Sequence, residues 1–397
     1  MTPRFASKLP DVGTTIFTLM SRLSEQAGAV NLGQGFPDFE PPAVLLDALE
    51  RHCRSGKNQY APMAGLPRLR ELIAEKLERD YGARVDAESE ITVTSGATEG
   101  IFDAVAAVVS PGDEVVVLDP CYDSYEPAVR LQGGRVVHVP LRADFSPDFA
   151  RLKDALSPRT RLLIVNFPHN PSGAVLSADE LEQLAELVRD RPLFLLSDEV
   201  YEHIVFDGKP HQSFLRNAEL RARSFVVGSF GKAFHATGWK VGWVTAPALL
   251  SAELRKVHQF VTFSTSTPAQ HAFADVLEQA PEHLRTLPGF YQEKRDRFRE
   301  LLAPTRFRLL PVRGTYFQLV DYSALSAEDD LSFARTLTER ARVAAIPVSA
   351  LSESPASARG PAGRSSAETE PRLVRFCFAK KAETLALAAE RLIEFSR

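Results

Sequence analysis

The chain has 397 residues, of which 44% are hydrophobic and 25% charged, with a formal net charge of −4 at pH 7. That length allows two domains, or one large domain with a smaller one attached, in an ordinary globular protein. The charge argues against a nucleic-acid partner, because neutralising phosphates needs a basic surface. No stretch approaches the roughly 20 apolar residues of a membrane helix, and the N-terminus lacks a signal-peptide pattern. We therefore expect a cytoplasmic protein that binds neither nucleic acid nor membranes.

The cysteines and histidines show no motif. Cys53, Cys121 and Cys377 lie far apart and form no C-x-x-C pair. This pattern fits a reducing compartment, and we interpret all three as small apolar core residues. Because neither H-E-x-x-H nor a Cys/His cluster occurs in the sequence, we expect no metal site.

The middle of the chain alternates short apolar runs with amphipathic segments of helical length. Helices are predicted over TEGIFDAVAAVVS, SYEPAVRLQGG and SADELEQLAELVRDR. Strands are predicted at ITVTS, DEVVVLDP, GRVVHVPL, RLLIVNFP, PLFLLSDEV, SFVVGSF and KVGWVTAP. Strands this apolar, separated by helices, indicate an α/β fold with a mostly parallel sheet covered on both faces.

The pattern changes toward the C-terminus. It is helical from about Ala248 to Leu302, and FRLLPVRGTYFQLVD then alternates like antiparallel strands. A helix over 329–342 and a strand at PRLVRFCFA complete what resembles a smaller α+β unit.

We predict a large domain over residues 46–300, and a second unit made of the N-terminal arm (1–45) and a small domain (301–397). Residues 352–370 are rich in Ser, Ala, Pro and Gly and carry no aliphatic side chain larger than alanine. Such a segment cannot bury a core, so we expect a flexible surface loop, with a lid as the functional alternative.

Polar groups follow four of the predicted strands. They are Ser95–Thr98 after ITVT, Asn170 after LLIVN, Asp198 and Tyr201 after LFLLS, and Ser229 and Lys232 after SFVVG. Ligands of open parallel sheets bind beyond the carboxyl ends of the strands, so these groups should converge in one crevice. Taken singly, each has an ordinary structural role as a helix cap, a turn residue or a core residue.

Taken together, these groups supply what pyridoxal phosphate needs. A lysine holds its aldehyde covalently, and Lys232 is the candidate. A carboxylate, here Asp198, keeps the pyridine nitrogen protonated, and hydroxyl and amide donors bind the phenolic oxygen. Small residues at a helix start leave N–H groups free for the phosphate, and Ser229 and Lys240 are further phosphate candidates.

The segment around Lys232, SFGKAFHATGWKVGW, resembles the lysine signature of class I aminotransferases, which are pyridoxal-phosphate enzymes of fold type I. Further blocks agree in order and spacing: NLGQGFPDF, NQYAPMAGLPRLR, TSGATEG, DPCYDSYEP, NFPHNPSG, SDEVYEHIVF and VRFCFAKK. The resemblance covers nearly the whole chain and is nearest to the subgroup of methionine and kynurenine/glutamine aminotransferases. It implies a large domain with a mostly parallel sheet and a smaller α+β domain.

The resemblance also implies a role for each matched residue. Lys232, Asp198 and Tyr201 are the catalytic residues that it implies. The cofactor-binding set comprises Gly96, Ala97, Thr98, Ser229 and Lys240 at the phosphate, Tyr122 stacked on the ring, and Asn170, Asp198, Tyr201 and Lys232. Tyr60 matches a phosphate-contacting tyrosine that comes from the neighbouring subunit, which implies a homodimer with shared active sites.

Arg375 matches the arginine that binds the substrate carboxylate, with Gly35 and Asn170 nearby. An independent argument comes from its strand RLVRFCFA, where both faces are apolar. A buried arginine is costly unless an anion pairs with it, and its planar fork suits a carboxylate. An internal salt bridge is an equally open interpretation.

The resemblance implies ping-pong transfer of an amino group from an L-amino acid to a 2-oxo acid. The stretch VHQFVTFSTSTP (257–268) lacks the second arginine with which aspartate-preferring relatives bind a distal carboxylate. By similarity, Phe17, Tyr60, Tyr122 and Phe263 line an aromatic pocket, with Phe263 from the partner. We therefore expect methionine, phenylalanine, tyrosine, leucine, kynurenine or glutamine as donor. Core packing is the alternative for Phe17 and Phe263.

Other functions remain as alternatives. A carbon–sulfur β-lyase and an aspartate-preferring aminotransferase share the fold, whereas a pyridoxal-phosphate-sensing regulator usually adds a DNA-binding extension for which this chain has no room. A dinucleotide site is excluded because GQGFPD lacks the third glycine of G-x-G-x-x-G. A serine-hydrolase elbow is excluded because Val227 replaces the first glycine of G-x-S-x-G.

Overall fold

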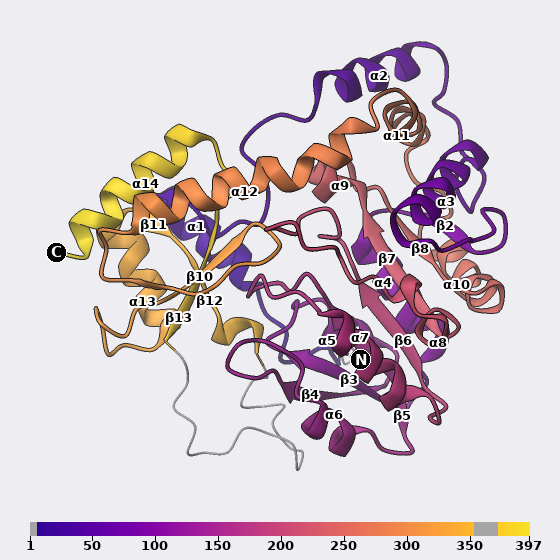
Figure 1. Ribbon diagram of the computed structural model, residues 1–397, viewed down its shortest axis with the longest axis horizontal. Helices are drawn as coiled ribbons and strands as arrows, with labels where there is room; N and C mark the ends of the chain where they lie inside the picture. The colour runs from indigo at the N-terminus through magenta and orange to yellow at the C-terminus, as the bar shows by residue number, and fades with distance from the viewer. Residues whose placement is uncertain (1–5, 353–371) are drawn as a thin grey trace, which may run out of the picture.

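The structure is a computed structural model that describes residues 6–352 and 372–397. Apart from Ser352, the loop predicted at 352–370 lies outside the described residues. Figure 1 shows a large sheet with helices on both sides and a smaller sheet beside it.

The large sheet has seven strands in the order β2-β8-β7-β6-β5-β3-β4. All neighbouring pairs are parallel except those of β8, which runs antiparallel to β2 and β7. The strands are β2 (Ile91–Thr94), β3 (Glu114–Asp119), β4 (Arg135–Pro140), β5 (Thr160–Asn166), β6 (Phe194–Asp198), β7 (Ser224–Ser229) and β8 (Gly242–Thr245). The predicted α/β fold with a mostly parallel sheet is confirmed.

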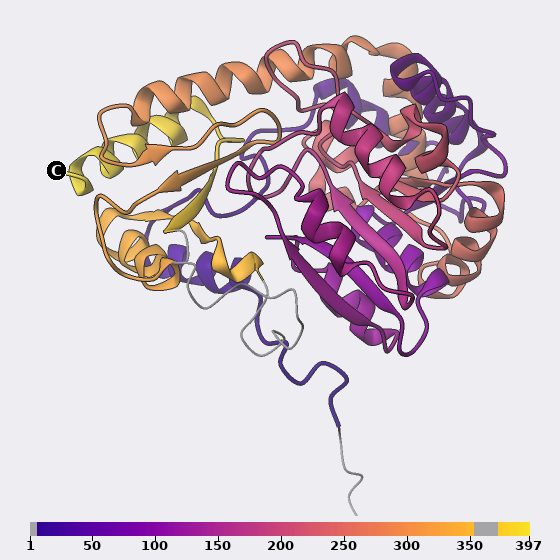
Figure 2. The same cartoon turned by 60° about the horizontal axis from the view of Figure 1, so that its bottom comes forward.

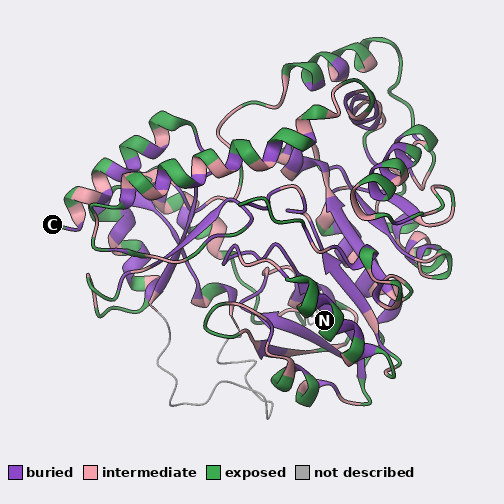
Figure 3. Ribbon diagram, in the orientation of Figure 1, coloured by how far each residue is buried: buried purple, intermediate pink, exposed green. Residues whose placement is uncertain are grey.

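The central strands are apolar throughout because both faces of the sheet are buried. Side chains of a strand alternate between faces. On β3, Val115 and Val117 pack into one buried cluster, whereas Val116 and Leu118 pack into the other. Figure 3 shows these central strands as buried. This two-sided burial explains why the sequence shows continuous apolar runs there instead of alternation.

Different helices cover the two faces of the sheet. The cluster on one face includes side chains of α4 (Ala97–Val108), α5 (Tyr125–Leu131) and α10 (Ala248–Val261). The cluster on the other face includes side chains of α3 (Pro67–Tyr81), α6 (Phe149–Ala155), α7 (Ala178–Val188) and α11 (Thr267–Gln279). The outer helix α2 (Ala43–Arg54) packs on α11, and the short α8 (Ala218–Arg221) and α9 (Phe230–Ala233) flank β7.

The smaller unit contains an antiparallel sheet in the order β12-β13-β10-β9. Its strands are β9 (Arg308–Leu309), β10 (Phe317–Asp321), β12 (Ile346–Pro347) and β13 (Leu373–Cys377). A parallel pair joins β1 (Val30–Asn31) to β11 (Val343–Ala344), which links the N-terminal arm to this unit. The helices are α1 (Ile16–Ala27), α13 (Asp330–Thr336) with a π turn (Leu337–Ala341), and α14 (Ala382–Phe395).

The helix α12 (Glu282–Leu302) extends from the side of the large sheet to α14 (Figure 1). Strands of the large sheet fall between residues 91 and 245, and those of the smaller antiparallel sheet between 308 and 377. The boundaries at 45/46 and 300/301 stay predictions.

The structure also bears on the cysteines and on membrane-spanning helices. Cys121 and Cys377 are buried, but Cys53 is exposed on α2, so its assignment to the core is wrong. The amphipathic helix α2 places this position on its outer face, a detail that a lone cysteine does not reveal. Among the described residues, no helix has both the length and the apolar character that a membrane span requires.

Candidate active site

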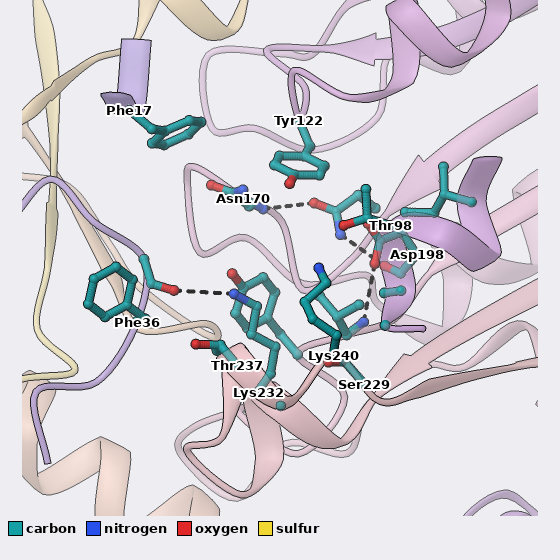
Figure 4. A pocket seen from close by; sticks show the side chains of 18 of the residues that line it. Phe17, Phe36, Thr98, Tyr122, Asn170, Asp198, Ser229, Lys232, Thr237 and Lys240 are labelled. Carbon is teal, nitrogen blue, oxygen red and sulfur yellow. Dashed lines mark hydrogen bonds between the residues drawn. The ribbon is translucent and has the colours of Figure 1, made fainter. Parts of the chain in front are cut away.

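A cavity of about 340 Å³ lies beyond the carboxyl ends of the large-sheet strands. This volume is at the lower end of the range for small-molecule sites. Thirteen of the residues predicted from sequence line it: Phe17, Gly35, Gly96, Ala97, Thr98, Tyr122, Asn170, Asp198, Tyr201, Ser229, Lys232, Lys240 and Arg375. Figure 4 shows Lys232, Lys240, Tyr122 and Asn170 turned toward one another from separate elements.

The sheet register brings these groups together. In the parallel ladder, Asn166 at the end of β5 pairs with Asp198 at the end of β6, and Asp198 pairs with Val227 of β7. The strand β7 then runs directly into α9, whose third residue is Lys232. Adjacent strand ends therefore deliver a carboxylate and an amine to the same cavity, as the topology of such sheets requires.

The N-terminus of α4 forms an open anion cradle, which we define as residues 95–98. The helix begins at Ala97 with Gly96 as its N-cap, and no side-chain oxygen caps it. Gly96 has a φ of 78°, and a Cβ there would lie 3.3 Å from Nζ of Lys240. Uncapped N–H groups and a neighbouring ammonium make this turn suited to a phosphate. The alternative that Ser95 or Thr98 serves as the helix cap is not what the structure shows.

Asp198 is buried, with 4% of its surface exposed, and three hydrogen bonds fix its position. Tyr125 donates from its hydroxyl to Oδ2 at 2.6 Å, and the backbone N–H of Val200 donates to Oδ1 at 3.3 Å. The side-chain amide of Asn166 donates to the backbone carbonyl of Asp198 at 2.9 Å. Burial raises the pKa of Asp198 to about 6, although the Tyr125 bond opposes the rise.

Lys232 also lines the cavity. Its Nζ donates to the carbonyl oxygen of Gly35 at 3.2 Å and lies 5.7 Å from the ring centroid of Tyr201. Burial lowers the pKa of Lys232 to about 8. An amine with this pKa is partly deprotonated near neutral pH, so it can act as a nucleophile and as a base.

Arg375 lies on β13 with 1% of its surface exposed. Its Nη1 donates to Oδ1 of Asn170 at 2.6 Å, and its Nη2 donates to the carbonyl of Gly33 at 2.9 Å. The guanidinium carbon lies 3.9 Å from the ring centroid of Phe317 and 5.2 Å from that of Phe17. Within residues 6–352 and 372–397 it forms no ion pair with a carboxylate, which goes against an internal salt bridge. This buried charge is therefore available to an anionic ligand.

Two predicted residues are not at this cavity. The side chains of Tyr60 and Phe263 are 82% and 42% exposed, respectively. Their rings meet edge to face with centroids 5.3 Å apart on the surface of the chain. Their place in a partner's site stays a prediction.

The structure also shows residues that sequence reasoning missed. Gln34, Phe36, Ile101, Asn166, Val200, Gly231, Thr237, Val241 and Phe317 also line the cavity. Asn166 could have been predicted, because it is a polar residue at the end of the apolar run LLIVN. Tyr125, the second tyrosine of YDSY, carried none, since a buried tyrosine on a helix has the pattern of a core residue.

We predict that Asp198→Asn stabilises the cofactor-free protein at pH 7 by about 3 kcal/mol. The carboxyl of Asp198 binds its proton more tightly in the folded than in the unfolded protein, so wild-type stability falls as the pH rises from about 4 to about 6. The variant does not lose stability in this pH range, because asparagine does not ionise. Its side-chain oxygen can still accept the hydrogen bond from Tyr125. Urea unfolding of both proteins at pH 4 and pH 7 measures the difference, which should shrink at the lower pH. A pH-independent difference would contradict the prediction.

Comparison with known proteins agrees with this geometry. The family described as Aminotransferase class I and II matches residues 27–392. The chain is 50% identical to the methionine aminotransferase of Escherichia coli (strain K12), over 97% of each chain. It is 41% identical to a probable N-succinyldiaminopimelate aminotransferase of Mycobacterium tuberculosis (strain CDC 1551 / Oshkosh), over 97% of each chain. It is 33% identical to mouse kynurenine–oxoglutarate transaminase 3, over 97% of this chain and 89% of the relative.

Solved structures agree as well. An Escherichia coli protein described as having a methionine aminotransferase function superposes with a TM-score of 0.93 at 49% identity, over 99% of this chain and 100% of the other. The N-succinyldiaminopimelate aminotransferase of Mycobacterium tuberculosis gives a TM-score of 0.92 at 40% identity, with the same coverage. The cavity thus lies in a fold type I scaffold, and the chain belongs to the family of class I and II aminotransferases.

Proposed function

We propose that the cavity binds pyridoxal 5′-phosphate and that the enzyme transfers the amino group of an apolar, sulfur-containing or aromatic L-amino acid to a 2-oxo acid. The observation that carries this proposal is the placement of Asp198 and Lys232 in the lining of one cavity that also contains the anion cradle. A carboxylate, an amine and a phosphate site are the three groups that this cofactor requires.

Each chemical group of the cofactor has a suitable residue in the cavity. The uncapped N–H groups at the start of α4, those of Ala97 and Thr98, have Lys240 and Ser229 beside them and suit its phosphate. Asp198 matches the pyridine nitrogen, because the Tyr125 bond favours its ionised form. Tyr122 provides a flat face, and Asn170 and Tyr201 provide donors to the phenolic oxygen.

When bound, pyridoxal phosphate supplies an electron-accepting ring that stabilises negative charge at the substrate Cα. Lys232 performs the proton transfer, since its lowered pKa allows Nζ to take the Cα proton and return one later. Arg375 orients the substrate by binding its α-carboxylate next to Asn170. The rings of Phe17 and Phe317 shield this ion pair from water, which strengthens it.

The proposal predicts the behaviour of Lys232→Ala. Its turnover should fall by more than about 1,000-fold, because one residue provides both the covalent attachment and the proton transfer. Cofactor binding should persist without covalent attachment through the anion cradle. Lys256→Ala, which removes an exposed lysine of α10, is the matched control and should retain full activity. Near-normal turnover of Lys232→Ala in a transaminase assay would refute the assignment.

The cavity favours an apolar donor side chain. Its charged lining residues are Asp198, Lys232, Lys240 and Arg375, each of which already has a role in the proposal. Phe17 and Phe36 lie at the cavity, and no further cation among the described residues lines it to bind a second substrate carboxylate. Burying a distal carboxylate there would cost its hydration without a counter-charge. The 50% identity to a methionine aminotransferase supports the same preference.

We predict that methionine or phenylalanine exceeds aspartate as donor by at least about tenfold in kcat/KM. A panel of the twenty amino acids against several 2-oxo acids measures this ratio. Aspartate as the best donor would contradict the pocket assignment and leave the cofactor chemistry intact. In the same panel, pyruvate released from a cysteine conjugate without any 2-oxo acid would favour the β-lyase alternative.

We also propose a homodimer in which Tyr60 and Phe263 reach the partner's cavity. The support is an exposed aromatic patch that their own chain leaves open: Tyr60, Phe260 and Phe263 are 82%, 85% and 42% exposed. Exposed patches of this kind mark interaction surfaces. Residues 6–10 also extend away from the body of the molecule (Figure 2) and are mostly exposed. A second copy of the chain would cover both features.

A further inference from the structure

A buried charge cluster lies directly behind the anion cradle. Glu99 and Asp103 are one helical turn apart on α4, and His258 of α10 faces both. Nδ1 of His258 lies 2.8 Å from Oε1 of Glu99 and 3.6 Å from Oδ2 of Asp103. Glu99 is 8% exposed, and the other two residues are fully buried. Neither carboxylate oxygen of Asp103 has a hydrogen-bond partner among the described residues.

Hydrogen-bond geometry makes His258 an imidazolium. Its Nε2 lies 3.0 Å from the backbone carbonyl of Met63, and a carbonyl oxygen only accepts. Its Nδ1 faces carboxylate oxygens, which also accept when ionised, so both ring nitrogens carry a proton. Burial alone would lower the pKa of His258, but the nearby carboxylates of Asp103 and Glu99 raise it to about 9. The cluster therefore holds one cation against two carboxylates.

Glu99 connects this cluster to the anion cradle. It is the third residue of α4, and its carboxylate accepts a hydrogen bond from the backbone N–H of Ser95. The hydroxyl of Thr262 also bonds to Glu99. A carboxylate in the first turn occupies the end of the helix that attracts anions. Without a counter-charge, Glu99 and Asp103 would oppose a phosphate at the same helix end.

We propose that His258 is a positioning residue for the anion cradle, and that its positive charge offsets Glu99 and Asp103 and so sets the affinity for the cofactor phosphate. This inference rests on the proposed function, in which the cradle binds that phosphate. His258 touches neither cofactor nor substrate in this scheme, because it lies behind α4 and outside the cavity lining.

Other charges do not replace His258 in this role. The charged groups that face it are Glu99 and Asp103 of α4, and the loop before α3 offers only the Met63 carbonyl. Arg255, on the same helix as His258, donates instead to Thr92 and to the backbone carbonyls of Glu88 and Ile91. A divalent metal is the competing interpretation, since the three ligand groups lie within 4.8 Å of one another. The Met63 bond and the 2.8 Å Glu99 contact favour protons on both nitrogens.

The test compares two probes on the cofactor-free protein, pyridoxal phosphate and pyridoxal, which lacks the phosphate. His258→Gln should raise the Kd of pyridoxal phosphate about tenfold, as expected for an uncompensated charge in a helix first turn. The Kd of pyridoxal should change less than about twofold, because the defect acts on the phosphate alone. The double variant His258→Gln/Glu99→Gln removes the opposing charge and should restore most of the phosphate-dependent affinity. Fluorescence titration of each protein gives both constants.

Three results would overturn the inference. They are an equal loss of affinity for both probes, no recovery in the double variant, or a stoichiometric metal ion that purifies with the wild type and is absent from His258→Gln. If His258→Gln does not fold, Asp103→Asn provides the test in the wild-type background. Removing that negative charge should leave the Kd of pyridoxal phosphate unchanged or lower, and a weaker Kd with unchanged pyridoxal binding would contradict us. A wild type that binds neither probe would instead refute the proposed function.

Discussion

The site depends on the parallel pairing of β6 with β7, which places a carboxylate and an amine in the lining of one cavity. The register pairs Asp198 with Val227, so the chain needs only the turn into α9 to present Lys232. Burial pushes both groups toward neutrality, with pKa values of about 6 for Asp198 and about 8 for Lys232. Both groups therefore titrate close to neutral pH, which is the range in which proton transfer is most efficient.

The other charges of the cavity are arranged around this pair. Among the described residues that line the cavity, Lys232, Lys240 and Arg375 are accompanied by one carboxylate, that of Asp198. This surplus of positive charge suits ligands that bring a phosphate and a carboxylate, as a pyridoxal-phosphate aminotransferase requires. Arg375 also remains without a carboxylate partner among the described residues, although it is fully buried. Such an uncompensated charge is costly in the free protein, and ligand binding relieves that cost.

Much of this arrangement could be predicted from sequence because many of the site residues come directly after predicted strands. Asn170, Asp198, Ser229 and Lys232 follow apolar runs that the pattern identifies as strands, and parallel strands present their carboxyl ends on one side. The role of Tyr122 came from resemblance to a family: it follows β3, but an aromatic side chain there has the pattern of a core residue. Arg375 lies within a strand of the smaller sheet, so its role came from the resemblance and from the cost of burying an arginine.

Contacts between elements far apart in the sequence could not be predicted in this way. Tyr125 supports Asp198 across 73 positions, and His258 meets Glu99 across 159. Neither residue shows more in the sequence than a core pattern on an amphipathic helix. The error at Cys53 has the same origin, because residue type alone does not say which helix face is covered. Tyr60 and Phe263 depend on a second chain, so their roles stay predictions.

The central claim is that Lys232 is the residue to which pyridoxal phosphate is covalently bound. The most direct measurement is borohydride reduction of the cofactor-loaded enzyme, followed by proteolysis and mass spectrometry of the pyridoxyl-labelled peptide. Our account predicts one label per chain, on Lys232, with none on Lys240 although that lysine lines the same cavity. A label on Lys240, or labels scattered over surface lysines with Lys232 unmodified, would contradict it.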